Sequence, residues 1–114
     1  MLKIFFKSTC STCKNALALI KVNTDEDYEL VEYMVETPSQ KEIKEILKML
    51  GMNAFDMVRT KESLYKTKFE GKKFTNAQWI KILAENPILI ERPIVVKDGK
   101  AIIGRPIERI LEII

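Results

Sequence analysis

The residues of this chain best suited to do chemistry are two cysteines, Cys10 and Cys13, which form a C-x-x-C motif. An apolar run at residues 2–6 predicts a buried strand before the motif, and apolar residues at helical spacing predict a helix over about 11–22 after it. A cysteine at the start of a helix faces unpaired backbone N–H groups and the positive end of the helix dipole. Both favour the thiolate, which is the reactive form of cysteine. The motif therefore indicates thiol chemistry, with both cysteines as candidate catalytic residues.

Other assignments for the motif are few. A Cys/His zinc site within one chain is excluded, because zinc takes four ligands and the chain has no third cysteine and no histidine. A structural disulfide across so short a loop would constrain the unfolded chain little. No signal peptide is recognisable, so we expect a cytoplasmic protein, and there a C-x-x-C beside a strand and a helix is typical of redox proteins. Two inert, half-buried cysteines are the remaining alternative.

Arginine is scarce among the 19 basic residues, and lysine is common. A guanidinium binds an oxyanion through two parallel hydrogen bonds, which an ammonium group cannot do. A chain that uses lysine for most of its positive charge and keeps a few arginines could use those arginines to hold an anion. Judged by their number alone, the arginines would more simply be interpreted as scattered surface charges. The arginines are Arg59, Arg92, Arg105 and Arg109.

Composition limits the class of protein and its partners. The 114 residues suit one domain, and 46% hydrophobic with 31% charged residues is typical of a soluble globular protein. No apolar run approaches the roughly 20 residues of a membrane span. The net charge of +3 is too small to indicate nucleic-acid binding. We expect a monomer that binds neither nucleic acid directly nor a membrane, and that holds no metal.

The first part of the chain predicts a β-α-β unit. A second strand at residues 28–33 follows the strand and helix around the motif, which favours two parallel strands joined by a right-handed crossover. The middle of the chain is helical in pattern. Ser39 with Glu42, and Thr75 with Gln78, match the capping box that begins a helix, and Gly51 is a natural helix end.

The last third of the chain predicts a β-hairpin and a closing helix. Residues 94–96 and 101–103 are apolar and flank Asp98-Gly99, a dipeptide typical of hairpin turns. Pro106 suits the first position of a helix. This helix is expected to bury Ile107, Ile110, Leu111 and Ile114.

The order of elements indicates the fold class. A β-α-β unit, a helical middle and a β-β-α unit, with the C-x-x-C between the first strand and the first helix, predict a thioredoxin-like α/β fold with a small, mixed, four-stranded sheet. We expect residues 1–114 to form a single domain of this kind, with a helical insertion at about 37–87.

Several segments together resemble the ArsC family, which comprises glutaredoxin-coupled arsenate reductases and their Spx-type relatives. These segments are Cys10 leading the first helix, Arg59 after a helical insert, the run at 86–96, and Gly104-Arg105-Pro106. The resemblance covers essentially the whole chain. It implies reduction of arsenate to arsenite, with glutathione as co-substrate, glutaredoxin or thioredoxin as protein reductant, and no bound cofactor.

The resemblance also implies roles for individual residues. Cys10 matches the family's nucleophilic cysteine, and Arg59, Arg92 and Arg105 match arginines that hold the oxyanion substrate. Arg92 precedes a proline that is cis in this fold, so the Arg92–Pro93 bond is expected to be cis. Three arginines and helix N–H groups would together neutralise arsenate and stabilise the thiolate.

Departures from the family pattern keep two alternatives open. Phe6 stands where many single-cysteine reductases have a histidine, and Cys13 stands where they usually have serine. Cys13 fits the Spx-type regulators, which switch a C-x-x-C between dithiol and disulfide and bind RNA polymerase, and it also fits a general disulfide oxidoreductase. Arg59 and Arg105 favour the reductase, because those regulators generally lack them.

Overall fold

The computed structural model describes residues 2–114, which form two compact units. The first unit combines the two ends of the chain, up to Glu36 and again over Arg92–Ile114, and the second unit is Thr37–Glu91. The chain thus leaves the first unit, builds the second, and returns. Each unit is described by itself.

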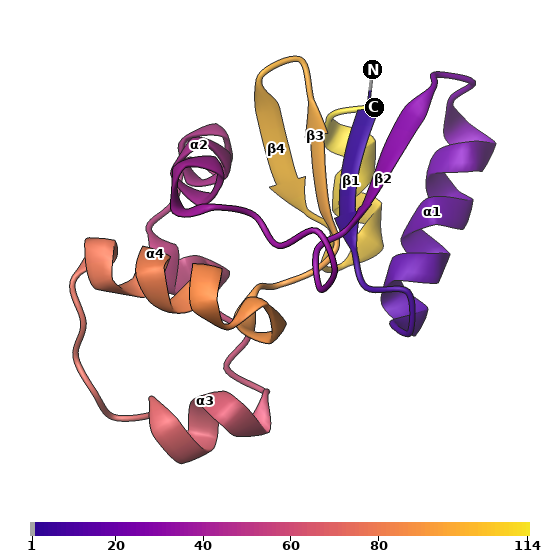
Figure 1. The fold of residues 1–114 in the computed structure, drawn as a ribbon. Coiled ribbons are helices and arrows are strands. Elements are labelled where there is room, and N and C mark those ends of the chain that lie inside the picture. The colour runs from indigo at the N-terminus through magenta and orange to yellow at the C-terminus, as the bar shows by residue number, and fades with distance from the viewer. Residues whose placement is uncertain (1) are drawn as a thin grey trace. The chain divides into compact units, whose positions relative to one another are not determined.

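A four-stranded mixed sheet forms the centre of the first unit, as the sequence predicts (Figure 1). Its strands are β1 (Leu2–Phe6), β2 (Tyr28–Glu32), β3 (Ile94–Lys97) and β4 (Lys100–Ile103), in the order β2-β1-β3-β4. β1 pairs parallel with β2 through the crossover helix α1 (Ser11–Asn23) and antiparallel with β3, and β3 and β4 form the hairpin. This is the thioredoxin-like arrangement.

The core of the first unit lies between one face of the sheet and two helical segments. Ile4, Val95 and Ile102 are paired across neighbouring strands, so their side chains form a row on the same face. Ile20 of α1 and Ile110 near the end of the chain pack against this row, and both are fully buried. Burial of these aliphatic side chains fixes α1, and with it the position of its first residue.

The closing segment is a 3-10 helix, η3 (Ile107–Glu112), and the expected burial of Leu111 is wrong. Leu111 is 45% exposed, whereas Ile110 is fully buried. A 3-10 helix has three residues per turn, so residues three apart lie on one side. Ile107 and Ile113 therefore pack with Ile110, and Leu111 turns to solvent. Pro106 precedes this helix as its N-cap residue.

The second unit is helical, as the sequence predicts. It contains α2 (Gln40–Leu50), α3 (Ser63–Lys68) and α4 (Asn76–Glu85), with two 3-10 turns, η1 (Ala54–Met57) and η2 (Pro87–Leu89). Both predicted capping boxes are present, at the starts of α2 and α4. Gly51 ends α2 with a φ of 70°, a left-handed conformation that glycine adopts without steric cost.

An aromatic cluster forms one part of the core of the second unit. Trp79 of α4 is 4% exposed, and its ring centroid lies 5.1–6.0 Å from those of Phe55, Phe69 and Phe74. Tyr65 of α3 stacks on the same indole at 6.3 Å. Buried aliphatic residues of α2 and α4, among them Ile43, Leu47 and Leu83, complete the core of this unit. Over residues 2–114, no helix combines the length and the apolar character that a membrane span requires.

Candidate functional site

Cys10 occupies the N-cap position of α1, at the end of the loop that follows β1. Its N–H donates to the carbonyl of Lys7 at 3.0 Å, and its carbonyl accepts from the N–H of Lys14 at 3.2 Å. Its side chain makes no capping hydrogen bond to the helix. The loop and the first helical turn therefore hold the backbone of Cys10 at the positive end of the helix dipole, and the sulfur is half-buried there.

Cys13 lies one turn further along α1 and is 3% exposed, and both cysteines are free thiols in this structure. Burial raises the pKa of the Cys13 thiol to about 11, and the neighbouring charge on Cys10 adds to this, although a backbone hydrogen bond at Lys7 works the other way. Of the two sulfurs, Cys13 is therefore the one that keeps its proton.

Cys10 is the sulfur that ionises. Burial opposes ionisation, but hydrogen bonds from the backbone N–H and the thiol of Cys13, and then the hydrogen bond and the charge of the Arg92 guanidinium, outweigh it and lower the pKa of Cys10 to about 7. A thiol with this pKa is half thiolate near neutral pH, so Cys10 has the ionisation of an activated nucleophile.

Two of the predicted arginines lie at Cys10. Arg105 Nη2 is 3.7 Å from Cys10 Sγ, and Arg105 Nε donates to the backbone carbonyl of Arg92 at 2.6 Å. Arg92 is 5% exposed, and its Nη1 donates to Tyr33 Oη at 3.3 Å. Residues from four separate parts of the sequence therefore meet within one unit.

The sheet explains this meeting. Arg92 and Pro93 come just before β3, and Ile94 at the start of β3 pairs with Phe5 near the end of β1. The segment before β3 therefore lies beside the loop that carries Cys10. The Arg92–Pro93 bond is cis, as predicted, and the Arg105–Pro106 bond is also cis, which the sequence analysis did not predict.

Gly104 lets the segment before Arg105 pack closely. Its N–H donates to the carbonyl of Pro93 at 2.9 Å. A Cβ at this position would lie 2.9 Å from Ile110 Cδ1 and 3.1 Å from Pro93 Cγ, closer than such atoms normally approach. Because Gly104 has no side chain, the segment after β4 can approach Pro93. This brings Arg105 close to Arg92, the residue before Pro93.

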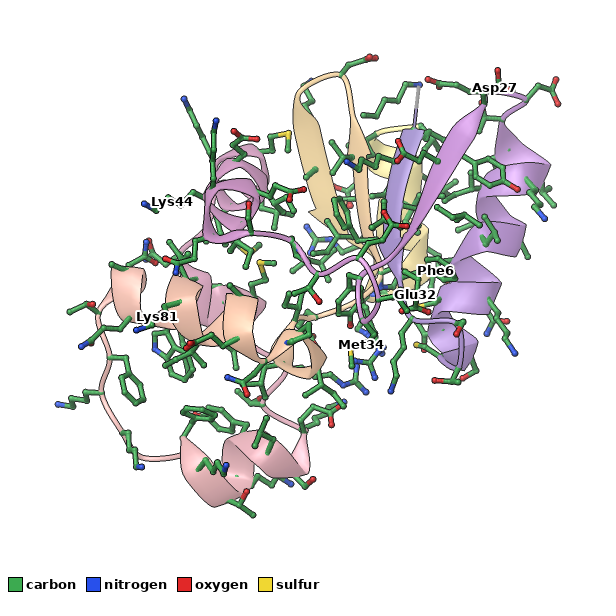
Figure 2. The ribbon with its side chains drawn as sticks, in the orientation of Figure 1. Phe6, Asp27, Glu32, Met34, Lys44 and Lys81 are labelled. Carbon is green, nitrogen blue, oxygen red and sulfur yellow. The ribbon has the colours of Figure 1, made fainter. Side chains whose placement is uncertain are left out.

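Glu32 and Tyr33, at the end of β2, belong to the site although the sequence analysis did not select them. Glu32 Oε2 accepts from the N–H of Ser8 at 2.6 Å, and its Oε1 accepts from the N–H of Met34 at 3.3 Å. Figure 2 shows Glu32 beside Phe6 at this end of the sheet. The carboxyl ends of parallel strands meet at one edge, so the parallel pairing of β1 and β2 was the signal that could have placed both residues at the cysteine loop.

Arg59 lies in the second unit, where carboxylates surround it. Arg59 Nε is 3.0 Å from Glu62 Oε1, and its Nη1 is 3.7 Å from Glu91 Oε1. An isolated antiparallel bridge between Val58 and Ile90 brings the backbones next to Arg59 and Glu91 together. The predicted convergence of Arg59 with Cys10 stays a prediction.

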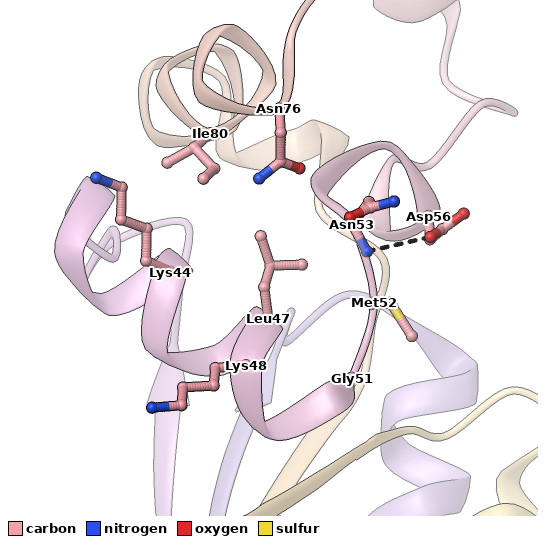
Figure 3. Close-up of a pocket in the computed structure, with 9 residues that line it drawn as sticks. All are labelled: Lys44, Leu47, Lys48, Gly51, Met52, Asn53, Asp56, Asn76 and Ile80. Carbon is pink, nitrogen blue, oxygen red and sulfur yellow. Dashed lines mark hydrogen bonds between the residues drawn. The ribbon is translucent and has the colours of Figure 1, made fainter.

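The second unit also has a pocket of about 450 Å³ (Figure 3). Lys44 and Lys48 project from α2 at its edge, and the N–H of Asn53 donates to Asp56 Oδ2 at 3.2 Å on its other side. The remaining lining residues are Leu47, Gly51, Met52, Asn76 and Ile80. None of the residues that line it is a cysteine, so the candidate catalytic site stays at Cys10. Among residues 2–114, no group of three or more His, Cys, Asp or Glu side chains is arranged to hold a metal ion.

Comparison with known proteins shows what this chain is similar to. A model of the ArsC family matches residues 5–113. An arsenate reductase of Neisseria meningitidis serogroup A is 37% identical over 111 residues, which cover 96% of this chain and 94% of that protein. YfgD of Escherichia coli K12, an uncharacterized protein, is 43% identical over 115 residues, which cover 98% and 95% of the two chains. The structure of an arsenate reductase from Vibrio cholerae superimposes with a TM-score of 0.92 at 37% identity, over 99% of this chain and 97% of that one.

Proposed function

The chain belongs to the ArsC family, and from that membership we propose that it is an arsenate reductase that uses Cys10 as nucleophile and glutathione as reductant. The substrate class comes from relatives named arsenate reductase that match nearly the whole chain. The role of each residue comes from the site of this chain. Glutaredoxin is the proposed protein reductant, with thioredoxin as the alternative donor to be compared.

The reaction begins when the Cys10 thiolate attacks arsenic. A sulfur–arsenic bond forms, and one arsenate oxygen leaves as water after protonation. The thiolate of glutathione then attacks the Cys10 sulfur, the sulfur–arsenic bond breaks, and its electron pair stays on arsenic. Arsenic(V) becomes arsenic(III), arsenite leaves, and Cys10 is left in a mixed disulfide that glutaredoxin reduces with a further glutathione.

One observation carries the proposal, which is the contact between Arg105 Nη2 and Cys10 Sγ at 3.7 Å. A guanidinium placed at the sulfur can hold one oxygen of an incoming oxyanion and stabilise the charge that develops during attack. Arg92 supplies a second positive charge at the same sulfur. A general thiol oxidoreductase has no need for two arginines at its nucleophile, whereas an oxyanion substrate uses both. Arg59 is proposed as a third oxyanion ligand.

The test is arsenite formation from arsenate with glutathione and glutaredoxin. We expect turnover by the wild-type chain and none above background by Cys10→Ser, with Ser11→Ala as a matched control that keeps turnover. Arsenate should also slow alkylation of Cys10 by iodoacetamide, because bound arsenate covers the sulfur. If no thiol donor supports arsenite formation and arsenate leaves alkylation unchanged, the reductase assignment is wrong.

Cys13 favours a second candidate function, a general disulfide oxidoreductase. Its thiol and its backbone N–H both hydrogen-bond to Cys10, as in a pair that alternates between dithiol and disulfide. In that case the wild-type chain would reduce a small disulfide such as hydroxyethyl disulfide, Cys13→Ser would abolish this activity, and arsenate would not inhibit it. If the chain is an arsenate reductase, arsenate should inhibit this disulfide reduction.

A further inference from the structure

Tyr33 is a buried tyrosine whose hydroxyl meets a buried guanidinium. Tyr33 follows the last residue of β2 and is 1% exposed, and its Oη accepts a hydrogen bond from Arg92 Nη1 at 3.3 Å. Arg92 is 5% exposed. Within residues 2–114, it is the most deeply buried charged residue of the first unit. A guanidinium taken out of water needs hydrogen-bond acceptors in defined places, so the hydroxyl that receives it also determines its orientation.

Arg92 acts on Cys10 through two of its groups, the guanidinium and the backbone carbonyl. Its guanidinium hydrogen-bonds to Cys10 and favours the thiolate. Its backbone carbonyl accepts from Arg105 Nε at 2.6 Å, and Arg105 in turn places Nη2 at 3.7 Å from the sulfur. A change in the orientation of the Arg92 guanidinium would therefore alter its own contact with the sulfur, while Arg105 is held by the Arg92 backbone.

The backbone of Tyr33 is fixed by the sheet. Its N–H donates to the carbonyl of Phe6 at 3.3 Å, and this bond extends the parallel pairing of β1 and β2 by one residue. The preceding residue, Glu32, binds the N–H of Ser8 in the loop that carries Cys10. The backbone of Tyr33 is thus anchored at the end of the sheet, and a residue that orients another side chain requires such an anchor.

We propose that Tyr33 is a positioning residue of the cysteine site, and that its hydroxyl holds the Arg92 guanidinium in the orientation in which it faces Cys10. Tyr33 does not touch the reacting atoms in this role. It acts through Arg92, so its effect on Cys10 depends on the presence of that guanidinium. The effect on arsenate turnover rests on the proposed function, whereas the effect on ionisation of Cys10 does not.

The first experiment replaces Tyr33 by phenylalanine, which keeps the ring and removes the hydroxyl. The rate of Cys10 alkylation by iodoacetamide is measured against pH, with the modified residue identified by mass spectrometry. Tyr33→Phe should shift the midpoint to higher pH, and kcat/KM for arsenate should fall about tenfold, as expected for loss of one hydrogen bond to a charged group. Tyr28→Phe, at the other end of β2, is the matched control and should leave both quantities unchanged.

The second experiment repeats the comparison in a chain that carries Arg92→Met. Without a guanidinium the hydroxyl has nothing to orient, so adding Tyr33→Phe should cause no further shift in the midpoint. An equal shift in the two backgrounds would overturn the proposal, since Tyr33 would then act by another route. An unchanged midpoint in Tyr33→Phe alone would overturn it as well. If the wild-type chain reduces no arsenate but the midpoint shifts as described, the proposed function fails and the role of Tyr33 stands.

Discussion

Arginine is used differently in the two units of this chain. In the first unit, Arg105 donates to a backbone carbonyl and places its other end at the sulfur of Cys10. In the second unit, Arg59 lies between the carboxylates of Glu62 and Glu91. The carbonyl and the thiol carry no formal charge, so the positive charge of Arg105 is available to a thiolate or an anion, whereas that of Arg59 is already balanced. The partners of an arginine, and not its presence, decide what it can bind.

The two units also differ in how they are held together. The first unit packs aliphatic side chains from α1 and η3 against the sheet, whereas the second combines aliphatic side chains of α2 and α4 with aromatic rings around Trp79. Trp79 contacts several aromatic rings at once, so its removal should disturb more packing than the loss of part of one aliphatic side chain. Point substitutions should therefore have unequal effects in the two units.

The largest effect on stability is expected in the second unit from Trp79→Ala. Removal of the indole leaves a cavity among Phe55, Phe69 and Phe74 and should lower the free energy of unfolding by about 3–5 kcal/mol. Ile20→Val in the first unit should cost only about 0.5–1.5 kcal/mol. Urea denaturation followed by circular dichroism measures both. A loss below 1 kcal/mol for Trp79→Ala would contradict the central role of the indole.

The next effect concerns the two cysteines of the first unit. With a pKa of about 7 for Cys10 and about 11 for Cys13, the thiolate fraction at neutral pH differs by several orders of magnitude. Because a less basic thiolate is also a weaker nucleophile, we expect Cys10 to be alkylated about 100-fold faster than Cys13. The rate at Cys10 should rise with pH and level off above its midpoint near 7. Peptide mapping after timed iodoacetamide treatment measures both rates, and comparable rates at pH 7 would refute the assignment of the nucleophile.

Two glycines are required for different reasons. Gly104 leaves space for its neighbours, and Gly51 adopts a left-handed backbone conformation. Gly104→Ala in the first unit should cost about 1–3 kcal/mol, because its Cβ would meet Ile110 and Pro93. Gly51→Ala in the second unit has open space around the new Cβ but a φ of 70°, and should cost about 1 kcal/mol. Thermal denaturation of both variants gives the comparison. If Gly104→Ala is as stable as wild type, the close approach beside Pro93 does not constrain the site.

The last comparison replaces one arginine at a time by lysine. Arg105→Lys should lower kcat/KM for arsenate about tenfold, because the bidentate geometry is lost while the charge stays. We expect Arg59→Lys to weaken turnover less, since Arg59 must first give up its carboxylates. Arg109→Lys should change little, because Arg109 pairs with Glu112 on an exposed part of η3. Equal losses in all three variants would show that the difference between the units does not govern substrate binding.

Elements with a local signal were predictable from the sequence itself. Among the contacts between distant segments, the family resemblance led us to expect those of Arg92 and Arg105 with Cys10, and the others were not predictable. The strands, the two capping boxes and the Asp98-Gly99 hairpin depend on neighbouring residues, and the structure confirms them. Leu111 was assigned to the core because its spacing was interpreted with the period of an α-helix, and the tighter 3-10 winding changed that face. Local pattern cannot distinguish these two helices over so short a segment.

The site was predictable only in part for the same reason. Cys10 and its place at a helix start are local features, and the structure confirms that place. Tyr33 and Glu32 reach the cysteine loop through the register of two parallel strands, and the sequence around them has no motif. The carboxylate of Glu91 reaches Arg59 through a backbone bridge between distant residues. These contacts follow from tertiary pairing, which spacing along the chain does not encode.

The insertion of the second unit between the halves of the first has a consequence during synthesis. The ribosome makes Cys10 and Cys13 early, but Arg92 and Arg105 emerge only after the whole of Thr37–Glu91 has been made. Until then Cys10 has no arginine beside it, so the contribution of Arg92 to its lowered pKa is missing. The complete set of Cys10, Arg92 and Arg105 can form only after β3 has paired with β1, so the order of segments along the chain places assembly of the site at the end of synthesis.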